Sequence, residues 1–124
     1  MTLVLAVLIG GAVGAPLRFL IDRSVTSRTA GVGLIPEVPW GLVAVNVLGS
    51  AIAGVLLATT TGELRVLLLT GVCGALTTFS GFAWETHRLW SVRRPAFWVT
   101  IVLIPVTCVA AFLLTWLVTQ ALTG

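Results

Sequence analysis

Four long apolar runs, at about residues 2–20, 39–60, 64–90 and 96–122, take up most of this chain. Each is close to the ~20 apolar residues that an α-helix needs to cross the hydrocarbon core of a bilayer. Inside lipid, every backbone N–H and C=O must find a partner within the protein, which favours helices for the spanning segments. The runs therefore predict an all-α integral membrane protein with four transmembrane helices, in which residues 1–124 form a single membrane domain.

The composition leaves no material for a soluble domain beside these helices. Of 124 residues, 58% are hydrophobic and 9% are charged, so a ligand site is expected within the membrane or at its rim. No nucleophile–base pair and no glycine-rich phosphate loop occurs in the sequence, and an enzyme is not expected. The segment Met1–Val4 lacks the charged region of a cleavable signal peptide, so the first run is expected to remain as a span.

The third run has an unusual centre, where residues 71–82 are Gly-Val-Cys-Gly-Ala-Leu-Thr-Thr-Phe-Ser-Gly-Phe. Glycine weakens a helix, and serine and threonine hydroxyls compete for backbone partners. Irregular backbone at membrane depth is stable only where it is buried in protein or lines a wet cavity. These residues predict either a functional break in the third helix or a surface on which another helix packs closely.

The arginines predict one fixed orientation. With four spans, six of the seven arginines belong to the two connections on one side of the membrane, and Arg65 alone belongs to the other. Short loops with excess arginine remain in the cytoplasm, so both termini are predicted to lie outside. The net charge of +3 is therefore interpreted as a topology signal and not as a sign of nucleic-acid binding. The six arginines are Arg18, Arg23, Arg28, Arg88, Arg93 and Arg94.

Polar and aromatic side chains of the second and third runs are candidates for an anion path. An amide such as Asn46 is costly in a membrane unless paired, so it either bonds a neighbouring helix or points N–H donors into a pore. Phe79 and Phe82 are three residues apart, so on a helix they share a face. Aromatic pairs at this spacing usually pack in a core, but the positive edges of their rings can also attract an anion. Ser80 adds a hydroxyl donor beside them.

A break in the third helix would create two further kinds of site. Freed carbonyls near Gly74 and Thr77 would suit a hard cation, while the N-terminus of the second half-helix would favour an anion. Arg18 either extends to the interface or points inward to bond the freed carbonyls. Glu85 lies one turn beyond the phenylalanines, near the membrane edge, where it can pair with Arg88.

Three motifs, in order along the whole chain, carry a resemblance to a known family. Residues 10–19 are Gly-Gly-Ala-Val-Gly-Ala-Pro-Leu-Arg-Phe, residues 39–49 are Pro-Trp-Gly-Leu-Val-Ala-Val-Asn-Val-Leu-Gly, and residues 71–80 begin the interrupted stretch. With these motifs the chain resembles the small bacterial fluoride channels of the Fluc (CrcB) family. The resemblance implies four-helix subunits in the bacterial cell membrane, paired as an antiparallel dimer. It also implies two fluoride pores along the dimer interface and passive export of cytoplasmic fluoride.

The resemblance further implies roles for individual residues. The pore would contain Asn46, Phe79, Ser80 and Phe82. Backbone carbonyls of Gly74 and Thr77 would hold a structural sodium ion shared by the subunits. Arg18 would be a conformational anchor, and Glu85 would stand near a pore mouth.

Two features of this chain differ from the family pattern. Gly81 and Ala83 stand where hydroxyl residues are usual, and the fourth run lacks a tyrosine and serine track. Since a pore with fewer hydroxyls desolvates fluoride less well, one of the two pores is expected to receive little from this chain. The hydroxyl residues available in the fourth run are Thr100, Thr107, Thr115 and Thr119.

The arginine bias also bears on the partner. A subunit that inserts in both orientations should carry balanced arginines, and six against one is not balanced. The sequence therefore favours a homologous subunit of opposite orientation over a second copy of this chain.

Two alternative functions remain. A small multidrug exporter would need a carboxylate within the first span, whereas Asp22 comes only at its exit. A non-conducting partner subunit of a heteromeric channel would explain the small residues and the missing hydroxyls.

Overall fold

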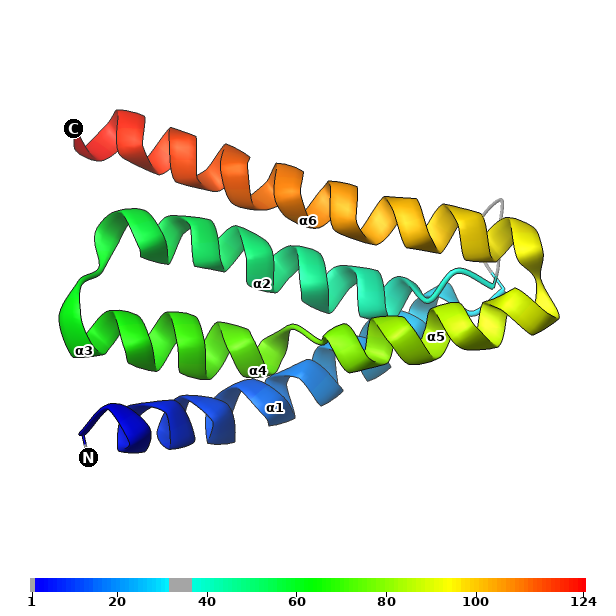
Figure 1. Ribbon diagram of the computed structural model, residues 1–124, viewed down its shortest axis with the longest axis horizontal. Helices are drawn as coiled ribbons and strands as arrows, with labels where there is room; N and C mark the ends of the chain where they lie inside the picture. The colour runs from blue at the N-terminus through cyan, green and yellow to red at the C-terminus, as the bar shows by residue number, and fades with distance from the viewer. Residues whose placement is uncertain (1, 32–36) are drawn as a thin grey trace.

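The computed structural model describes residues 2–31 and 37–124, and these residues form helices joined by short connections (Figure 1). Within them, four helical segments are long and apolar enough to cross a membrane, which makes this an all-helical, multi-pass membrane protein. The third segment, Gly62–Val92, is composite. The elements in chain order are α1 (Thr2–Thr29), α2 (Trp40–Thr59), α3 (Gly62–Arg65), the π-helix η1 (Val66–Cys73), α4 (Gly74–Leu76), α5 (Phe79–Val92) and α6 (Arg94–Thr123).

The first helix is longer than the predicted span of residues 2–20. A polar connection was expected from residue 21 to residue 38, but α1 continues to Thr29. The hydroxyls here bond within the helix and do not end it: Thr29 Oγ1 donates to the Val25 carbonyl at 2.8 Å, and Thr26 Oγ1 donates to Asp22 Oδ1 at 3.2 Å. The change to polar residues thus does not mark the end of the helix. Part of the expected connection, residues 32–36, lies outside the described residues.

The helices form a bundle in which α2 occupies the middle (Figure 1). It packs against α6 on one side and against α1 and η1 on another, while α1 runs obliquely across the third span. Both termini lie at the same end of the bundle as α3, and the turn between α5 and α6 lies at the opposite end (Figure 1).

Glycines allow α1 and η1 to approach at backbone contact. A Cβ atom added at Gly10 would lie 2.7 Å from the Gly71 Cα atom, and one added at Gly71 would lie 2.9 Å from the Gly10 Cα atom. One turn further along α1, a Cβ atom added at Gly14 would clash with the Val72 carbonyl oxygen of η1. Close packing, one of the two interpretations of the interrupted stretch, therefore occurs at its first residue, Gly71.

The other interpretation, a break in the helix, holds a few residues later. The first half of the third span ends at Leu76, and Thr77 leaves helical geometry with ψ 157°. Thr78 is also extended, with φ −147° and ψ 117°, and α5 begins at Phe79. The structure confirms that the third helix is broken.

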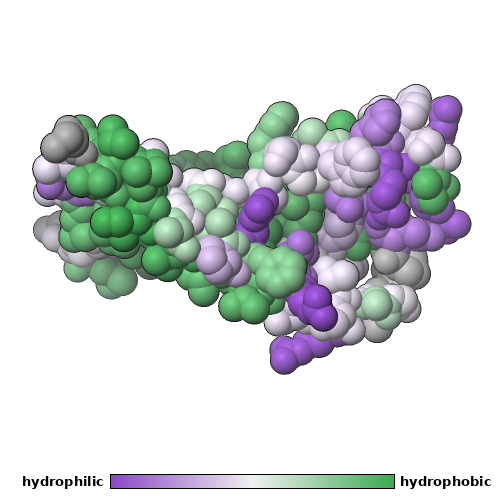
Figure 2. Space-filling view, turned by 90° about the horizontal axis from the view of Figure 1, so that it is seen from below, coloured by the Kyte–Doolittle hydropathy of each residue, from purple (hydrophilic) through white to green (hydrophobic). Residues whose placement is uncertain are grey.

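Much of the outer surface of the single chain is apolar. Figure 2 shows hydrophobic side chains over much of one face and hydrophilic ones gathered towards one end. The inward side of α6 contributes Ala96, Thr100 and Ile104, whereas Leu114 on its outer side is 65% exposed. Such a surface needs lipid or another protein to cover it.

We predict that Gly10→Ala lowers the stability of the bundle by about 1–3 kcal/mol, because the methyl group forces α1 and η1 apart. Gly11→Ala is the matched control, since a Cβ at Gly11 meets nothing within 4 Å. Alanine favours helix over glycine by up to about 1 kcal/mol, so the control should be neutral or slightly stabilising. Unfolding followed by circular dichroism during titration of micelles with dodecyl sulfate measures both, and equal stabilities would contradict the contact.

Candidate functional site

Asn46 of α2 bonds directly to the break in the third span. Its side chain is buried, with 7% of the residue exposed, and Oδ1 accepts the backbone N–H of Thr78 at 2.8 Å. Its Nδ2 donates to the Leu42 carbonyl at 2.9 Å. An uninterrupted helix would instead join the Thr78 N–H to the Gly74 carbonyl. The Asn46 side chain therefore replaces that carbonyl as the acceptor and frees it from its helical donor.

The second half of the span begins with a hydroxyl cap. Thr78 Oγ1 accepts the N–H of Gly81 at 3.0 Å and lies 3.1 Å from Ser80 Oγ. Threonine at this position satisfies one of the amides that a helix start leaves without a partner. The N-terminus of α5, with its partial positive charge, thus lies beside two hydroxyl groups.

The two phenylalanines and Asn46 line one groove, which has a volume of about 370 Å³. The ring centroids of Phe79 and Phe82 are 5.9 Å apart, and the ring planes are tilted by 47°. Phe79 is 81% exposed, so its ring projects from the single chain. The other residues that line this groove are Ser50, Thr77, Thr78, Ile104, Pro105 and Cys108.

The two candidate carbonyl residues, Gly74 and Thr77, line an adjoining groove of about 410 Å³. Ser50, Thr77 and Cys108 border both grooves, which places the carbonyl side of the break next to the phenylalanines. Gly74 is exposed. The structure therefore brings the candidate anion residues and the candidate cation residues to neighbouring parts of one surface.

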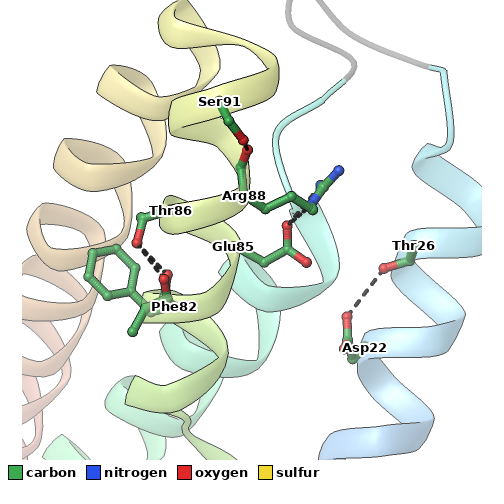
Figure 3. Close-up of polar contacts among 8 residues, drawn as sticks. Asp22, Thr26, Phe82, Glu85, Thr86, Arg88 and Ser91 are labelled. Carbon is green, nitrogen blue, oxygen red and sulfur yellow. Dashed lines mark hydrogen bonds and ion pairs between the residues drawn. The ribbon is translucent and has the colours of Figure 1, made fainter.

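A polar pocket of about 540 Å³ lies between the break and the arginine-rich end. Figure 3 shows two polar pairs on facing helices: Glu85 with Arg88, joined by a 2.8 Å ion pair, and Asp22 with Thr26. The ion pair has the spacing that the sequence suggested. Thr78 lines both this pocket and the phenylalanine groove, so the pocket extends to the start of α5.

Arg18 is half-buried and lines the same polar pocket. Among the described residues it forms no hydrogen bond and no ion pair. The inward bond from Arg18 to freed carbonyls, one of its two proposed arrangements, is therefore not formed within this chain.

Sequence reasoning missed Thr78. This residue supplies both the amide that Asn46 holds and the hydroxyl that caps α5. A threonine immediately before the phenylalanine pair was a recognisable helix-start signal, because serine and threonine are preferred at that position. The partner of its amide, 32 residues away, had no local signal.

With this geometry described, similarity to known proteins can be considered. A family model described as CrcB-like protein, Camphor Resistance (CrcB), matches residues 5–119. The chain belongs to the CrcB family. The resemblance inferred from the three motifs is confirmed.

Curated relatives in this family are named as ion channels and not as enzymes. Fluoride-specific ion channel FluC 1 of Nocardia farcinica is 50% identical over 84 residues, which are 67% of this chain and 56% of that protein. FluC 1 of Streptomyces avermitilis is 44% identical over 90 residues, 68% of each chain. Fluoride-specific ion channel FluC of Mesorhizobium japonicum is 33% identical over 120 residues, 91% of this chain and 93% of its own. This CrcB chain thus spans little more than half of the length of the Nocardia protein.

We predict that Asn46→Leu, which keeps the side-chain volume, destabilises the chain by about 1–3 kcal/mol because the Thr78 N–H loses its acceptor. Ser50→Ala is the control, since Ser50 lies one turn away on α2, lines the same groove and bonds to none of the described residues. Hydrogen exchange at the Thr78 amide reports the bond directly. Slow exchange of that amide in Asn46→Leu would contradict the role of Asn46.

Proposed function

We propose that this chain is a pore-forming subunit of a fluoride-selective channel that allows cytoplasmic fluoride to leave the cell passively. The bond between Asn46 and Thr78 is the observation that carries the proposal. It holds the start of α5 beside the groove lined by Phe79 and Phe82. Membership of the CrcB family and the names of the curated relatives support fluoride as the ion.

The chemistry of the surface suits a small anion. The polar pocket is bordered by Arg18 and Arg88 but also by Asp22, Glu37 and Glu85, so attraction of anions would come from the excess of arginines around it and not from the pocket lining itself. At its inner limit lie Thr78 and Gly81, at the positive N-terminus of α5, and the Ser80 hydroxyl beside Thr78 would add a donor that replaces part of the hydration shell of the ion. The tilted phenylalanine rings would then present positive edges along a narrow apolar path.

A structural sodium ion, which the family resemblance implies, fits the residues on the carbonyl side of the break. The Gly74 carbonyl lacks its usual helical donor, because the Thr78 N–H bonds to Asn46. Carbonyl oxygens are suitable ligands for a hard cation, and Gly74 and Thr77 would provide them. When bound, sodium would supply positive charge that balances the exposed carbonyl dipoles.

A second subunit would complete these surfaces. Phe79 is 81% exposed and Gly74 is also exposed, so the candidate sites lie on the outside of the single chain. Pairing in an antiparallel dimer would cover both and would place pores along the interface. We propose that the partner is a homologous subunit of opposite orientation, because the arginine bias predicts a single orientation for this chain, with both termini outside.

The hydroxyls of α6 support an unequal contribution to the two pores. Thr107, Thr115 and Thr119 all donate to carbonyls of their own helix, at 2.6, 2.9 and 2.7 Å. Thr100 is fully buried. Few of these α6 hydroxyls are therefore free to bond an ion. This favours a second candidate function, in which the chain is a subunit that does not conduct along its α6 side.

The multidrug-exporter alternative needs a carboxylate within the first apolar run. Asp22 instead lies in the polar pocket, where it accepts a hydrogen bond from Thr26.

We predict that Phe82→Ala lowers fluoride efflux from liposomes that contain the complete channel by about tenfold, corresponding to about 1.4 kcal/mol of lost ring–anion stabilisation. Leu114→Ala, on the 65% exposed outer side of α6, should leave efflux unchanged. A fluoride-selective electrode measures both rates. Unchanged efflux in Phe82→Ala would reject a pore role for the phenylalanine pair and would favour a purely structural subunit.

We predict that this chain, expressed alone, inserts in one orientation, because six arginines favour one side of the membrane and one favours the other. Alkaline phosphatase fused to the C-terminus should be active outside the cell membrane, and a fluorescent protein fused there should remain dark. Comparable signals from the two fusions would show dual insertion and would remove the argument for a different partner.

A further inference from the structure

The turn between α5 and α6 carries an aromatic cluster built around one arginine. The Arg94 guanidinium carbon lies 4.4 Å from the centroid of the Trp90 ring. Trp90 meets Phe97 edge to face at 5.0 Å, and Phe97 meets Trp98 in the same way at 5.1 Å. We call these four residues the α5–α6 corner.

Within the part of the chain that the structure describes, Arg94 differs from Arg88 and Arg93 in having no carboxylate partner. Arg88 pairs with Glu85 at 2.8 Å, and Arg93 lies 3.6 Å from Glu37. Among the described residues, Arg94 forms no ion pair and donates no hydrogen bond. A guanidinium with one face against an aromatic ring keeps its N–H edge available, and that edge matches two oxygens of a phosphate group. Trp90 therefore orients a charge that has no acceptor within the described residues.

The surroundings of Arg94 favour a ligand with negative charge. The part of the bundle from the polar pocket to the corner carries six arginines and three acidic residues, namely Asp22, Glu37 and Glu85. The opposite end carries only Arg65 and Glu63, so the whole net charge of +3 belongs to the first part. Arg94 also opens the 30-residue helix α6, whose N-terminus adds a partial positive charge.

The corner also has the apolar side chains of a membrane interface. Trp90 is 45% exposed, Trp98 is 60% exposed, and Val92 is 65% exposed at the end of α5. Tryptophan concentrates at the level of lipid headgroups, where its ring contacts both acyl chains and polar groups. A soluble phosphate would leave these apolar surfaces uncovered, whereas a lipid would cover them.

We propose that the α5–α6 corner binds the headgroup phosphate of an anionic glycerophospholipid, with Arg94 as the bidentate donor and Trp90 as its support. Trp98 contacts the glycerol and upper acyl region of the same lipid. This site lies apart from the break in the third span, and it does not depend on whether the chain conducts fluoride.

The test uses the full chain reconstituted in phosphatidylcholine vesicles with spin-labelled phosphatidylglycerol or spin-labelled phosphatidylcholine as the probe. Electron paramagnetic resonance gives the fraction of each label immobilised by the protein. One arginine near an anionic surface contributes about 1 kcal/mol, so Arg94→Gln should lower the preference for phosphatidylglycerol by about fivefold. Arg94→Lys should give an intermediate value, because lysine keeps the charge but not the planar fork.

Arg23→Gln is the matched control, since it removes the same charge from the same end at an exposed position outside the corner. Its charge acts only at longer range and is screened over about 8 Å in physiological salt, so the preference should fall by less than about twofold. Equal losses in Arg23→Gln and Arg94→Gln would show diffuse attraction and overturn the site. Full retention of the preference in Arg94→Lys would overturn the bidentate geometry.

Two further experiments complete the design. Trp90→Leu keeps Arg94 but removes the ring that supports it, so it should weaken the preference for phosphatidylglycerol. This variant also tests the site if Arg94→Gln fails to fold, and an unchanged preference would contradict the stacked arrangement. Inorganic phosphate should leave the immobilised fraction unchanged. Displacement of the labelled lipid by inorganic phosphate would show that the corner binds a soluble anion and would overturn the lipid assignment. Circular dichroism confirms that each variant retains its helices.

Discussion

The hydrogen bond from the Thr78 N–H to Asn46 Oδ1 is the interaction on which the centre of this structure depends. A helix that stops at membrane depth leaves backbone amides without partners, and each costs several kcal/mol in a nonpolar environment. Asn46 supplies an acceptor from a different helix, at a buried position that packing of α2 against α6 keeps in place. Gly49, one turn further on α2, has no side chain to obstruct the methyl group of Thr77. The break is thus stabilised by α2 as well as by the Thr78 cap within the third span.

The same bond separates two kinds of polar group along one span. Before the break, the Gly74 carbonyl loses its donor, and the first half-helix ends with its negative end towards the break. After the break, the Thr78 hydroxyl accepts a hydrogen bond from the Gly81 N–H, and α5 begins with the partial positive charge of a helix N-terminus. Opposite charge preferences therefore arise a few residues apart without any ionised side chain, which limits the desolvation cost of a polar site in a membrane.

The sequence predicted the parts of the structure that have local causes. Four apolar runs indicated four spans. Glycine and threonine in residues 71–82 indicated either close packing or a break, and the structure shows close packing at Gly71 and a break at Thr77.

The extension of α1 to Thr29 was missed, because a helical segment whose hydroxyls bond within the helix has the composition of a loop. The π-helix η1 was also missed. It coincides with the contact that α1 makes at Gly10, and such long-range packing leaves no pattern in a single segment.

The candidate site shows why a single chain gives an incomplete account of function. Asn46 was open to two interpretations, an interhelical bond or a pore donor, and the structure shows the bond while also placing Asn46 in the groove. The two roles are compatible, since Nδ2 has a second hydrogen beyond the one donated to the Leu42 carbonyl. Phe79, in contrast, is 81% exposed, and its contact with the Phe82 ring, at 5.9 Å between centroids, leaves most of its surface open. In the proposed channel, a ring that presents its edge to an ion would need a defined orientation, so a surface beyond this chain would have to cover Phe79 and fix its ring.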